Sequence, residues 1–147
     1  REEYLARYAP PIDIDAQGTQ FFKALLYIRD QGWFFPHFHR DAAHNLGGGA
    51  MPPAVLHMLT LDLLKALDTY HLAYNAVFRH RVLERVAQLA CPVFLMADAA
   101  DPTRAGLARA AAQIADARHE VLSSPGGDAT QPSKAALIQA FLDAPAR

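Results

Sequence analysis

Residues 91–106, CPVFLMADAADPTRAG, contain the pattern that decides the fold of this chain. The run at 92–97 is continuously apolar and has the length of a strand, which is typical of a strand covered on both faces. Asp101 followed by Pro102 is a helix-start signature, because aspartate is a favoured N-cap and proline is tolerated in the first turn. The stretch therefore predicts a buried strand, an acidic turn and a helix that runs to about Ala115.

The residues after this helix predict a second strand and a closing helix. The strand covers 120–123, or 118–123, and PGG at 125–127 predicts a turn. The closing helix runs over 132–142 and is expected to bury four apolar side chains, which are Leu137, Ile138, Phe141 and Leu142. A strand–helix–strand order of this length is typical of a parallel pair with a right-handed crossover, so the fold class is α/β.

The first 90 residues are predicted to be almost entirely helical. Apolar residues recur at helical spacing, and the expected helices cover 1–8, 19–35, 53–67 and 70–79, with a short helix or turn at 82–90. Thr19 is the expected N-cap of the second helix, Pro36 is expected to end it, and Pro53 fits the first turn of the third. The change of pattern predicts two regions, a helical region at 1–90 and an α/β region at 91–147.

Composition excludes several classes of protein. The 147 residues are 52% hydrophobic with a net charge of −1, which gives no electrostatic support for binding nucleic acid or an anionic membrane. The single cysteine, Cys91, excludes an intramolecular disulfide and is predicted to be a buried small residue in a reducing, cytoplasmic setting. No apolar run reaches the roughly 18–20 residues of a membrane span. The glycines at 47–49 lack the strand and lysine of a phosphate-binding loop, and no cofactor is predicted.

Two groups of residues at 33–44 are candidates for a binding site. Trp33, Phe34, Phe35 and Phe38 form an aromatic group that is predicted either to belong to the core or to line an apolar pocket. His37, His39 and His44 lie near Asp41 but follow no strict metal-ligand spacing, so we expect loop histidines that face solvent or substrate, and no metal site.

Asp98 and Asp101 follow the predicted strand at the edge where ligands bind in open α/β sheets. One interpretation is that Asp101 only caps its helix. The other is that it holds a catalytic histidine in the correct tautomer, as the acid of a Ser-His-Asp triad does. The two roles are compatible.

Several segments resemble parts of the α/β-hydrolase superfamily. CPVFLMADAADP resembles its proline-led strand and following Asp-Pro turn, and RDQGWFFPHFHR with the helices up to about 67 resembles its inserted helical lid. The second strand, PGGDAT and the closing helix resemble its last strand, histidine loop and terminal helix. The resemblance implies a lid at 1–90 followed by the C-terminal part of the hydrolase core at 91–147. It also implies that Asp101 is the acid of the triad.

The sequence departs from this family at two functional positions. The nucleophile elbow G-x-S-x-G is absent, and the resemblance would place it before Arg1, so the chain is expected to be a fragment equivalent to the C-terminal half. Asp128 occupies the position expected for the catalytic histidine, and a carboxylate does not replace imidazole as a base near neutral pH unless its pKa is strongly raised. We therefore expect the isolated chain to lack a complete triad and to be inactive.

Three hypotheses for the function remain open. The first is hydrolysis of an ester or related acyl bond of an apolar small molecule, selected by the aromatic residues of the lid. The alternative is a non-catalytic module on the same scaffold that binds a ligand or a protein. The third is a separate helical domain whose likeness to hydrolases is accidental. Because two parallel strands leave an apolar edge unpaired, the run at 92–97 predicts a homo-oligomer or pairing with a missing N-terminal half.

Overall fold

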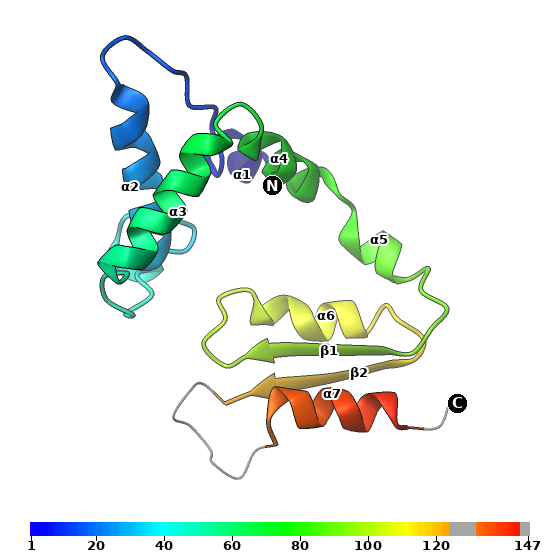
Figure 1. The fold of residues 1–147 in the computed structure, drawn as a ribbon. Coiled ribbons are helices and arrows are strands. Elements are labelled where there is room, and N and C mark those ends of the chain that lie inside the picture. The colour runs from blue at the N-terminus through cyan, green and yellow to red at the C-terminus, as the bar shows by residue number, and fades with distance from the viewer. Residues whose placement is uncertain (124–131, 145–147) are drawn as a thin grey trace. The chain divides into compact units, whose positions relative to one another are not determined.

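The chain forms two compact units that the contacts separate after His80 (Figure 1). The computed structural model describes residues 1–123 and 132–144. Unit 1 is Arg1–His80 and unit 2 is Arg81–Arg147. The residue pattern suggested a boundary after residue 90, whereas the contacts group the short helix after His80 with the strands.

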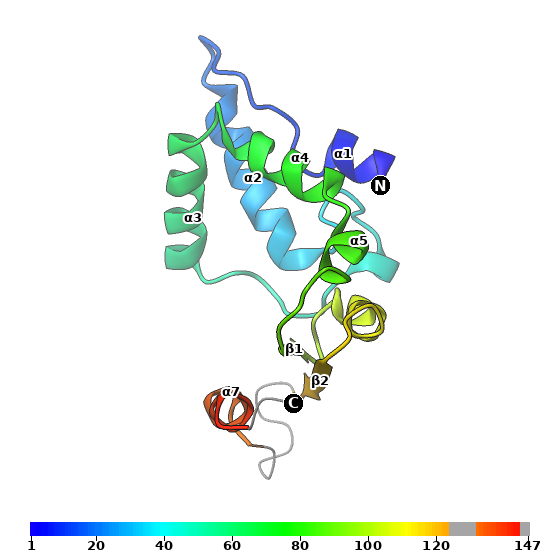
Figure 2. The same ribbon diagram turned by 90° about the vertical axis from the view of Figure 1, so that its right-hand side faces the viewer.

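Unit 1 consists of helices, as the sequence predicts. They are α1 (Glu2–Arg7), α2 (Thr19–Trp33), the 3-10 helix η1 (Ala42–His44), α3 (Pro53–Lys65) and α4 (Tyr70–Arg79). Helices α2 and α3 lie side by side, and α1 packs on α4 (Figures 1 and 2). The small core between them consists of Ile12, Ala24, Tyr27, Leu63 and Leu67.

The start of α2 corrects one prediction, because Thr19 is not the N-cap. Gly18 occupies that position with a φ of 72°, a left-handed conformation that glycine adopts without strain. The Asp15 carboxylate accepts the backbone N–H groups of Gln17 and Thr19, both at 3.0 Å, and also the Thr19 hydroxyl. These hydrogen bonds lower the pKa of Asp15, the Thr19 hydroxyl contributing most.

Helix α2 ends at Trp33, two residues earlier than predicted. Phe34 is already extended and forms an antiparallel bridge with Asn45. The Phe35 N–H donates to the His44 carbonyl at 2.9 Å, and the Leu46 N–H donates to the Trp33 carbonyl at 2.9 Å. Residues 36–44 therefore form a closed loop that returns to the end of α2.

Unit 2 has the predicted strand–helix–strand–helix order, which confirms the α/β class. Its elements are α5 (Val82–Val86), β1 (Val93–Asp98), η2 (Arg104–Gly106), α6 (Leu107–Ala111), β2 (Ala117–Leu122) and α7 (Lys134–Leu142). The strands are parallel, with Val93 opposite Ala117 and Asp98 opposite Leu122. Figure 2 views them nearly end-on, with α6 on one face of the sheet and α7 on the other.

The helix between the strands of unit 2 is shorter, and the side chains of unit 2 are more exposed, than the sequence suggested. The helix expected over 102–115 is divided into η2 and α6, because the turn after Asp101 continues as a 3-10 helix before regular α-helix begins. Every residue of β1 is half-buried rather than buried. Of the four side chains that α7 was expected to bury, Ile138 and Leu142 are exposed. Cys91 is also exposed, which corrects its assignment to the core.

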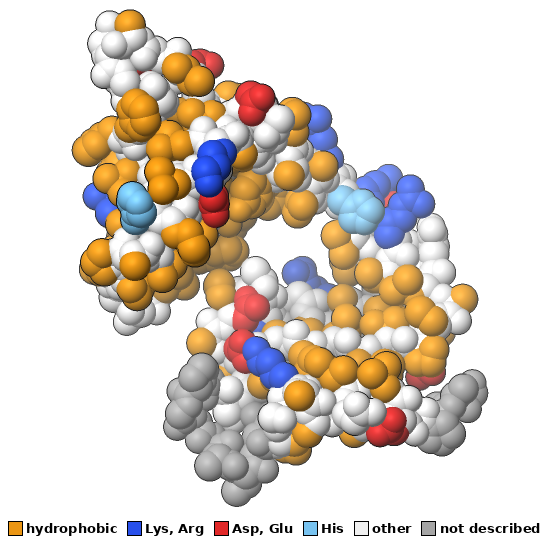
Figure 3. Space-filling model, viewed as in Figure 1, with side chains coloured by type: hydrophobic (Ala, Val, Ile, Leu, Met, Phe, Trp, Pro, Cys, Tyr) orange, Lys and Arg blue, Asp and Glu red, His pale blue; other side chains and the backbone are white. Residues whose placement is uncertain are grey.

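Apolar side chains spread over the surface of both units (Figure 3). In unit 1 they include Phe21 and Phe22 on α2 and Met58 on α3. Within the described residues, no helix is both long and apolar enough to cross a bilayer.

Candidate functional site

Unit 1 brings together an aromatic cluster from four segments of the chain. Its members, from α1, α2, the 36–44 loop and α4, are Tyr4, Tyr8, Tyr27, His37, Phe38, Tyr70, Tyr74 and Phe78. Most neighbouring rings meet edge to face at centroid distances between 4.8 and 5.7 Å, a favourable geometry for aromatic pairs. Burial raises the pKa of Tyr27 and, with the nearby Tyr74, raises that of Tyr70 to about 12.

His37 lies within this cluster as an uncharged imidazole. It is 5% exposed, and the rings of Tyr8 and Tyr27 lie 4.9 and 4.8 Å from its centroid. Burial lowers the pKa of His37 to about 4; Asp30 acts in the opposite direction, and Arg40 lowers it further. Its Nδ1 has no hydrogen-bond partner among the described residues. At neutral pH the His37 ring is therefore an uncharged member of the aromatic cluster.

Asp30 on α2 forms two ion pairs, and the one with Arg40 links α2 to the 36–44 loop. It is 1% exposed, and Arg29 donates to its Oδ1 through Nε at 2.8 Å and Nη2 at 2.7 Å. Arg40 Nη2 lies 2.8 Å from its other carboxylate oxygen. One buried carboxylate thus pairs with two guanidinium groups, so these three side chains together carry a net positive charge.

A cavity of about 380 Å³ lies against this cluster, near the lower end of the range for ligand pockets, about 300–1,000 Å³. It is lined by Arg7, Pro10, Pro11, Ile12, Lys23, Leu26, Tyr27, His37, Phe38 and Arg40. The lining is mainly apolar or aromatic, with three cationic side chains. All of it comes from unit 1.

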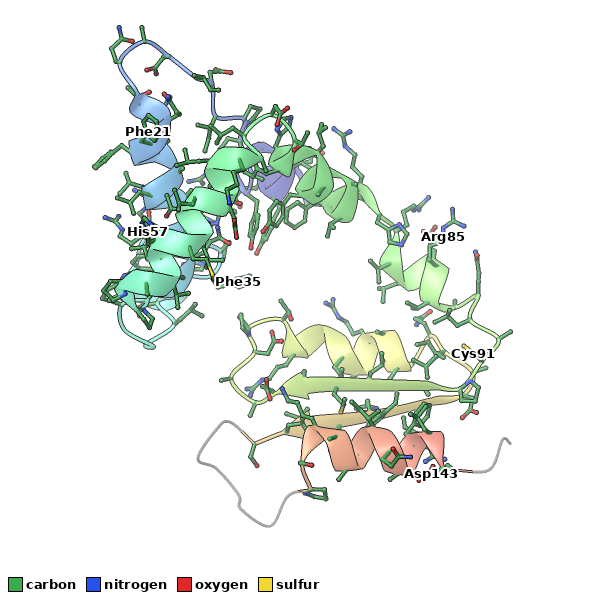
Figure 4. The ribbon with its side chains drawn as sticks, in the orientation of Figure 1. Phe21, Phe35, His57, Arg85, Cys91 and Asp143 are labelled. Carbon is green, nitrogen blue, oxygen red and sulfur yellow. The ribbon has the colours of Figure 1, made fainter. Side chains whose placement is uncertain are left out.

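Only one of the four predicted pocket residues lines this cavity. Phe38 does, whereas Trp33, Phe34 and Phe35 are half-buried and lie outside the lining. They lie at the C-terminal end of α2 and in the extended residues that follow it. Figure 4 shows Phe35 at the opposite end of α2 from Phe21.

The sequence analysis missed most of the cavity, although α2 carried one usable signal. Lys23, Leu26 and Tyr27 are three and four residues apart, so they share one helical face. Arg7 and the prolines at 10 and 11 had no such signal, because they lie on α1 and in the segment after it, and tertiary packing brings them to this face.

The second candidate site is the turn after β1, where the Asp101 side chain forms a local turn with Thr103. Its Oδ1 accepts the backbone N–H of Thr103 at 2.7 Å and the Thr103 hydroxyl at 2.6 Å. These two hydrogen bonds, the hydroxyl first, lower the pKa of Asp101. Asp98, at the end of β1, accepts a hydrogen bond from Lys134 Nζ of α7, with 2.9 Å between Nζ and Oδ2. The predicted cap is therefore wrong, because the N-cap of η2 is Thr103 and that of α6 is Gly106, neither with a side-chain cap hydrogen bond, and Asp101 instead stabilises the turn before η2.

The described residues do not bring a catalytic partner to Asp101. Within the described residues, the Asp101 carboxylate accepts hydrogen bonds from Thr103, and its backbone pairs with Asp98 and Arg104. Asp128, the residue at the expected histidine position, lies outside the described residues. Cys91 lies at the opposite end of β1 (Figure 4), some 20 Å along a strand of this length.

Two of the three loop histidines, His39 and His44, form a surface group, whereas His37 is buried beside the cavity. The rings of His39 and His44 stack at 4.6 Å, and His44 Nδ1 lies 2.7 Å from the Asp41 carboxylate. His39 Nε2 lies 3.2 Å from Glu3 on α1. Within residues 1–123 and 132–144, no group of three or more His, Cys, Asp or Glu side chains could hold a metal ion.

Comparison with known proteins finds no relative of this chain. No protein-family model, no curated protein and no solved structure matches the chain.

Proposed function

We propose that the chain binds a small, predominantly apolar molecule in the cavity of unit 1. The observation that carries this proposal is the 380 Å³ cavity beside a cluster of aromatic rings. Aromatic and apolar walls with a few polar groups are characteristic of small-molecule sites. This is the ligand-binding alternative from the sequence analysis, with the site placed on α1, α2 and the 36–44 loop.

A variant that fills the cavity tests this proposal. Leu26→Trp adds a bulky side chain to the lining, and Leu61→Trp is the control, because Leu61 lies on α3 outside the lining. Binding of uncharged 2-naphthamide would be followed by its fluorescence. We expect Leu26→Trp to weaken binding at least about tenfold and Leu61→Trp to leave it unchanged. Equal binding by wild type and both variants, or no binding by wild type of either 2-naphthamide or the corresponding carboxylate, would contradict the proposal.

Ester hydrolysis on an α/β-hydrolase scaffold is the second candidate. It is supported by the position of Asp101 after the carboxyl end of β1 and by the helices on opposite faces of the parallel pair. On this proposal residues 1–90 would form the lid, residues 91–147 would be the C-terminal part of the core, and Asp101 would be the acid. Asp128 would stand in the histidine position, so the base of the reaction is unassigned.

Turnover of 4-nitrophenyl butyrate tests the second candidate. Asp101→Asn keeps an oxygen that accepts from Thr103 but removes the charge that stabilises an imidazolium. We expect it to lower turnover by a factor of about 100 or more, whereas Asp116→Asn, at the start of β2, leaves it unchanged. Absence of turnover by the wild-type chain, or full activity of Asp101→Asn, would reject this candidate.

A further inference from the structure

The cavity of unit 1 has an unusual balance of charge. Its lining contains the cationic side chains of Arg7, Lys23 and Arg40 but no aspartate or glutamate among the described residues. A largely apolar wall would need none of these charges to hold a neutral ligand. The excess of positive charge indicates that the ligand carries a negative one.

The nearby carboxylates do not neutralise all three cations. Arg7 Nη1 contacts Glu3 at 2.8 Å on the surface of α1. Arg40 shares the single carboxylate of Asp30 with Arg29. Lys23 forms no ion pair within 4.0 Å among the described residues, although its charge contributes to the lowered pKa of Asp15. Lys23 is therefore the lining cation that is most available to a ligand.

The rest of the wall suits the body of an aromatic or alicyclic molecule. Tyr27 and Phe38 present rings, and His37 is an uncharged ring among them. The Arg7 guanidinium lies 4.8 Å over the Phe38 ring and donates to the Phe38 carbonyl at 3.1 Å, which holds this ring beside a cation. Apolar contact and charge are thus offered by adjacent residues of one cavity.

We propose that this cavity binds an organic acid, with its ring body against Tyr27 and Phe38 and its carboxylate paired with Lys23. This inference rests on the proposed binding function and specifies its ligand class. The ammonium group of lysine donates to a carboxylate without a fixed geometry, so a flexible Lys23 can follow ligands of different length.

A matched pair of probes tests the charge requirement in the full chain. 2-Naphthoate and 2-naphthamide have the same ring system and differ in charge, and their dissociation constants would be measured by calorimetry at low and physiological salt. We expect the carboxylate to bind about tenfold or more tightly than the amide, the gain that one charge-assisted hydrogen bond supplies. Lys23→Gln should remove this preference, whereas Lys65→Gln, a lysine of α3 outside the lining, should retain it.

The outcomes separate the two proposals. If both probes bind equally to the wild-type chain, or if Lys23→Gln keeps the preference for the carboxylate, the inference about an organic acid is overturned while cavity binding stands. If neither probe binds, the proposed binding function fails and the inference fails with it. Circular dichroism of each variant shows whether it keeps the helical content of the wild-type chain.

Discussion

Asp30 is a buried carboxylate on α2 whose neighbours are the exposed side chains of Arg29 and Arg40. We predict that Asp30→Asn lowers the free energy of unfolding by about 2 kcal/mol, because it removes the charge that ties the 36–44 loop to α2. Asp62→Asn is the control: Asp62 pairs with Lys65 at 3.3 Å on the surface, where such a pair contributes at most about 1 kcal/mol. Urea denaturation of both variants would measure the difference, and equal losses would contradict the prediction.

His37 gives unit 1 a predictable response to acid. Its pKa is lowered from 6.5 to about 4 by burial among Tyr8 and Tyr27, with Asp30 and Arg40 acting in opposite directions. Between these two values the unfolded chain binds a proton that the folded chain does not. The contribution of neutral His37 to the free energy of unfolding is therefore fully present above pH 6.5. It is lost as the pH falls towards 4, and the loss is about 3 kcal/mol at most.

The variant His37→Phe isolates this effect, because it keeps a ring between the two tyrosines and removes the proton site. We expect the unfolding free energy of the wild-type chain to fall more steeply than that of His37→Phe between pH 6.5 and 4. Carboxylates such as Asp15 and Asp101 titrate in both proteins and cancel in the comparison. Parallel pH profiles would show that His37 is not buried in its neutral form.

Single residues are also where the sequence was least informative. Thr19 fitted the N-cap preference, yet Gly18 is the N-cap of α2, and Asp15, four residues before Thr19, accepts the N–H and the hydroxyl of Thr19. A preference for residue types at one position does not show which nearby side chain will reach the free N–H groups, because the loop before the helix decides this. Phe38, His37 and Arg40 likewise became wall residues only through the closed loop at 36–44.

At the scale of elements the sequence was a better guide, because periodicity depends on local geometry. The four α-helices of unit 1 and the parallel strand pair of unit 2 lie close to the predicted ranges, whereas the short helix η1 was not predicted. Burial was predicted less well, since it depends on which elements meet. Ile138 and Leu142 were expected to be buried, whereas α7 turns only Leu137 and Phe141 towards partial burial.

Phe141 is the principal anchor of α7 on the sheet. Its ring stacks on Phe94 of β1 at 5.4 Å, and the Arg118 guanidinium of β2 lies 5.7 Å from it. We predict that Phe141→Ala lowers the free energy of unfolding by about 2 kcal/mol, because the stack and the cation contact are lost together. Leu142→Ala, on the next residue, should change it by less than about 0.5 kcal/mol, since Leu142 is 68% exposed. Thermal unfolding would measure the loss of unfolding free energy for both variants. Equal losses would show that Phe141 does not anchor α7 in this way.

At the scale of the whole molecule, the sheet of unit 2 has a backbone edge that the described chain does not pair. Among the described residues β1 pairs with β2 alone. The N–H groups of Val93 and Ala99 donate to β2, at 2.9 and 2.7 Å. Because N–H groups alternate in direction along a strand, that of Met96 points towards the free edge and that of Ala97 towards β2. A half-buried apolar strand with such an edge is a site for pairing with another strand.

We therefore predict that the chain self-associates through the free edge of β1. Light scattering at micromolar concentration should show dimers or larger species for the wild-type chain. Met96→Pro removes a donor from that edge only, so it should shift the chain towards the monomer while circular dichroism is retained. Ala97→Pro, one residue further, removes a donor from the β1–β2 ladder and should destabilise unit 2 instead. A wild-type chain that is monomeric under these conditions, or a Met96→Pro variant that associates as the wild type does, would show that this edge does not mediate association.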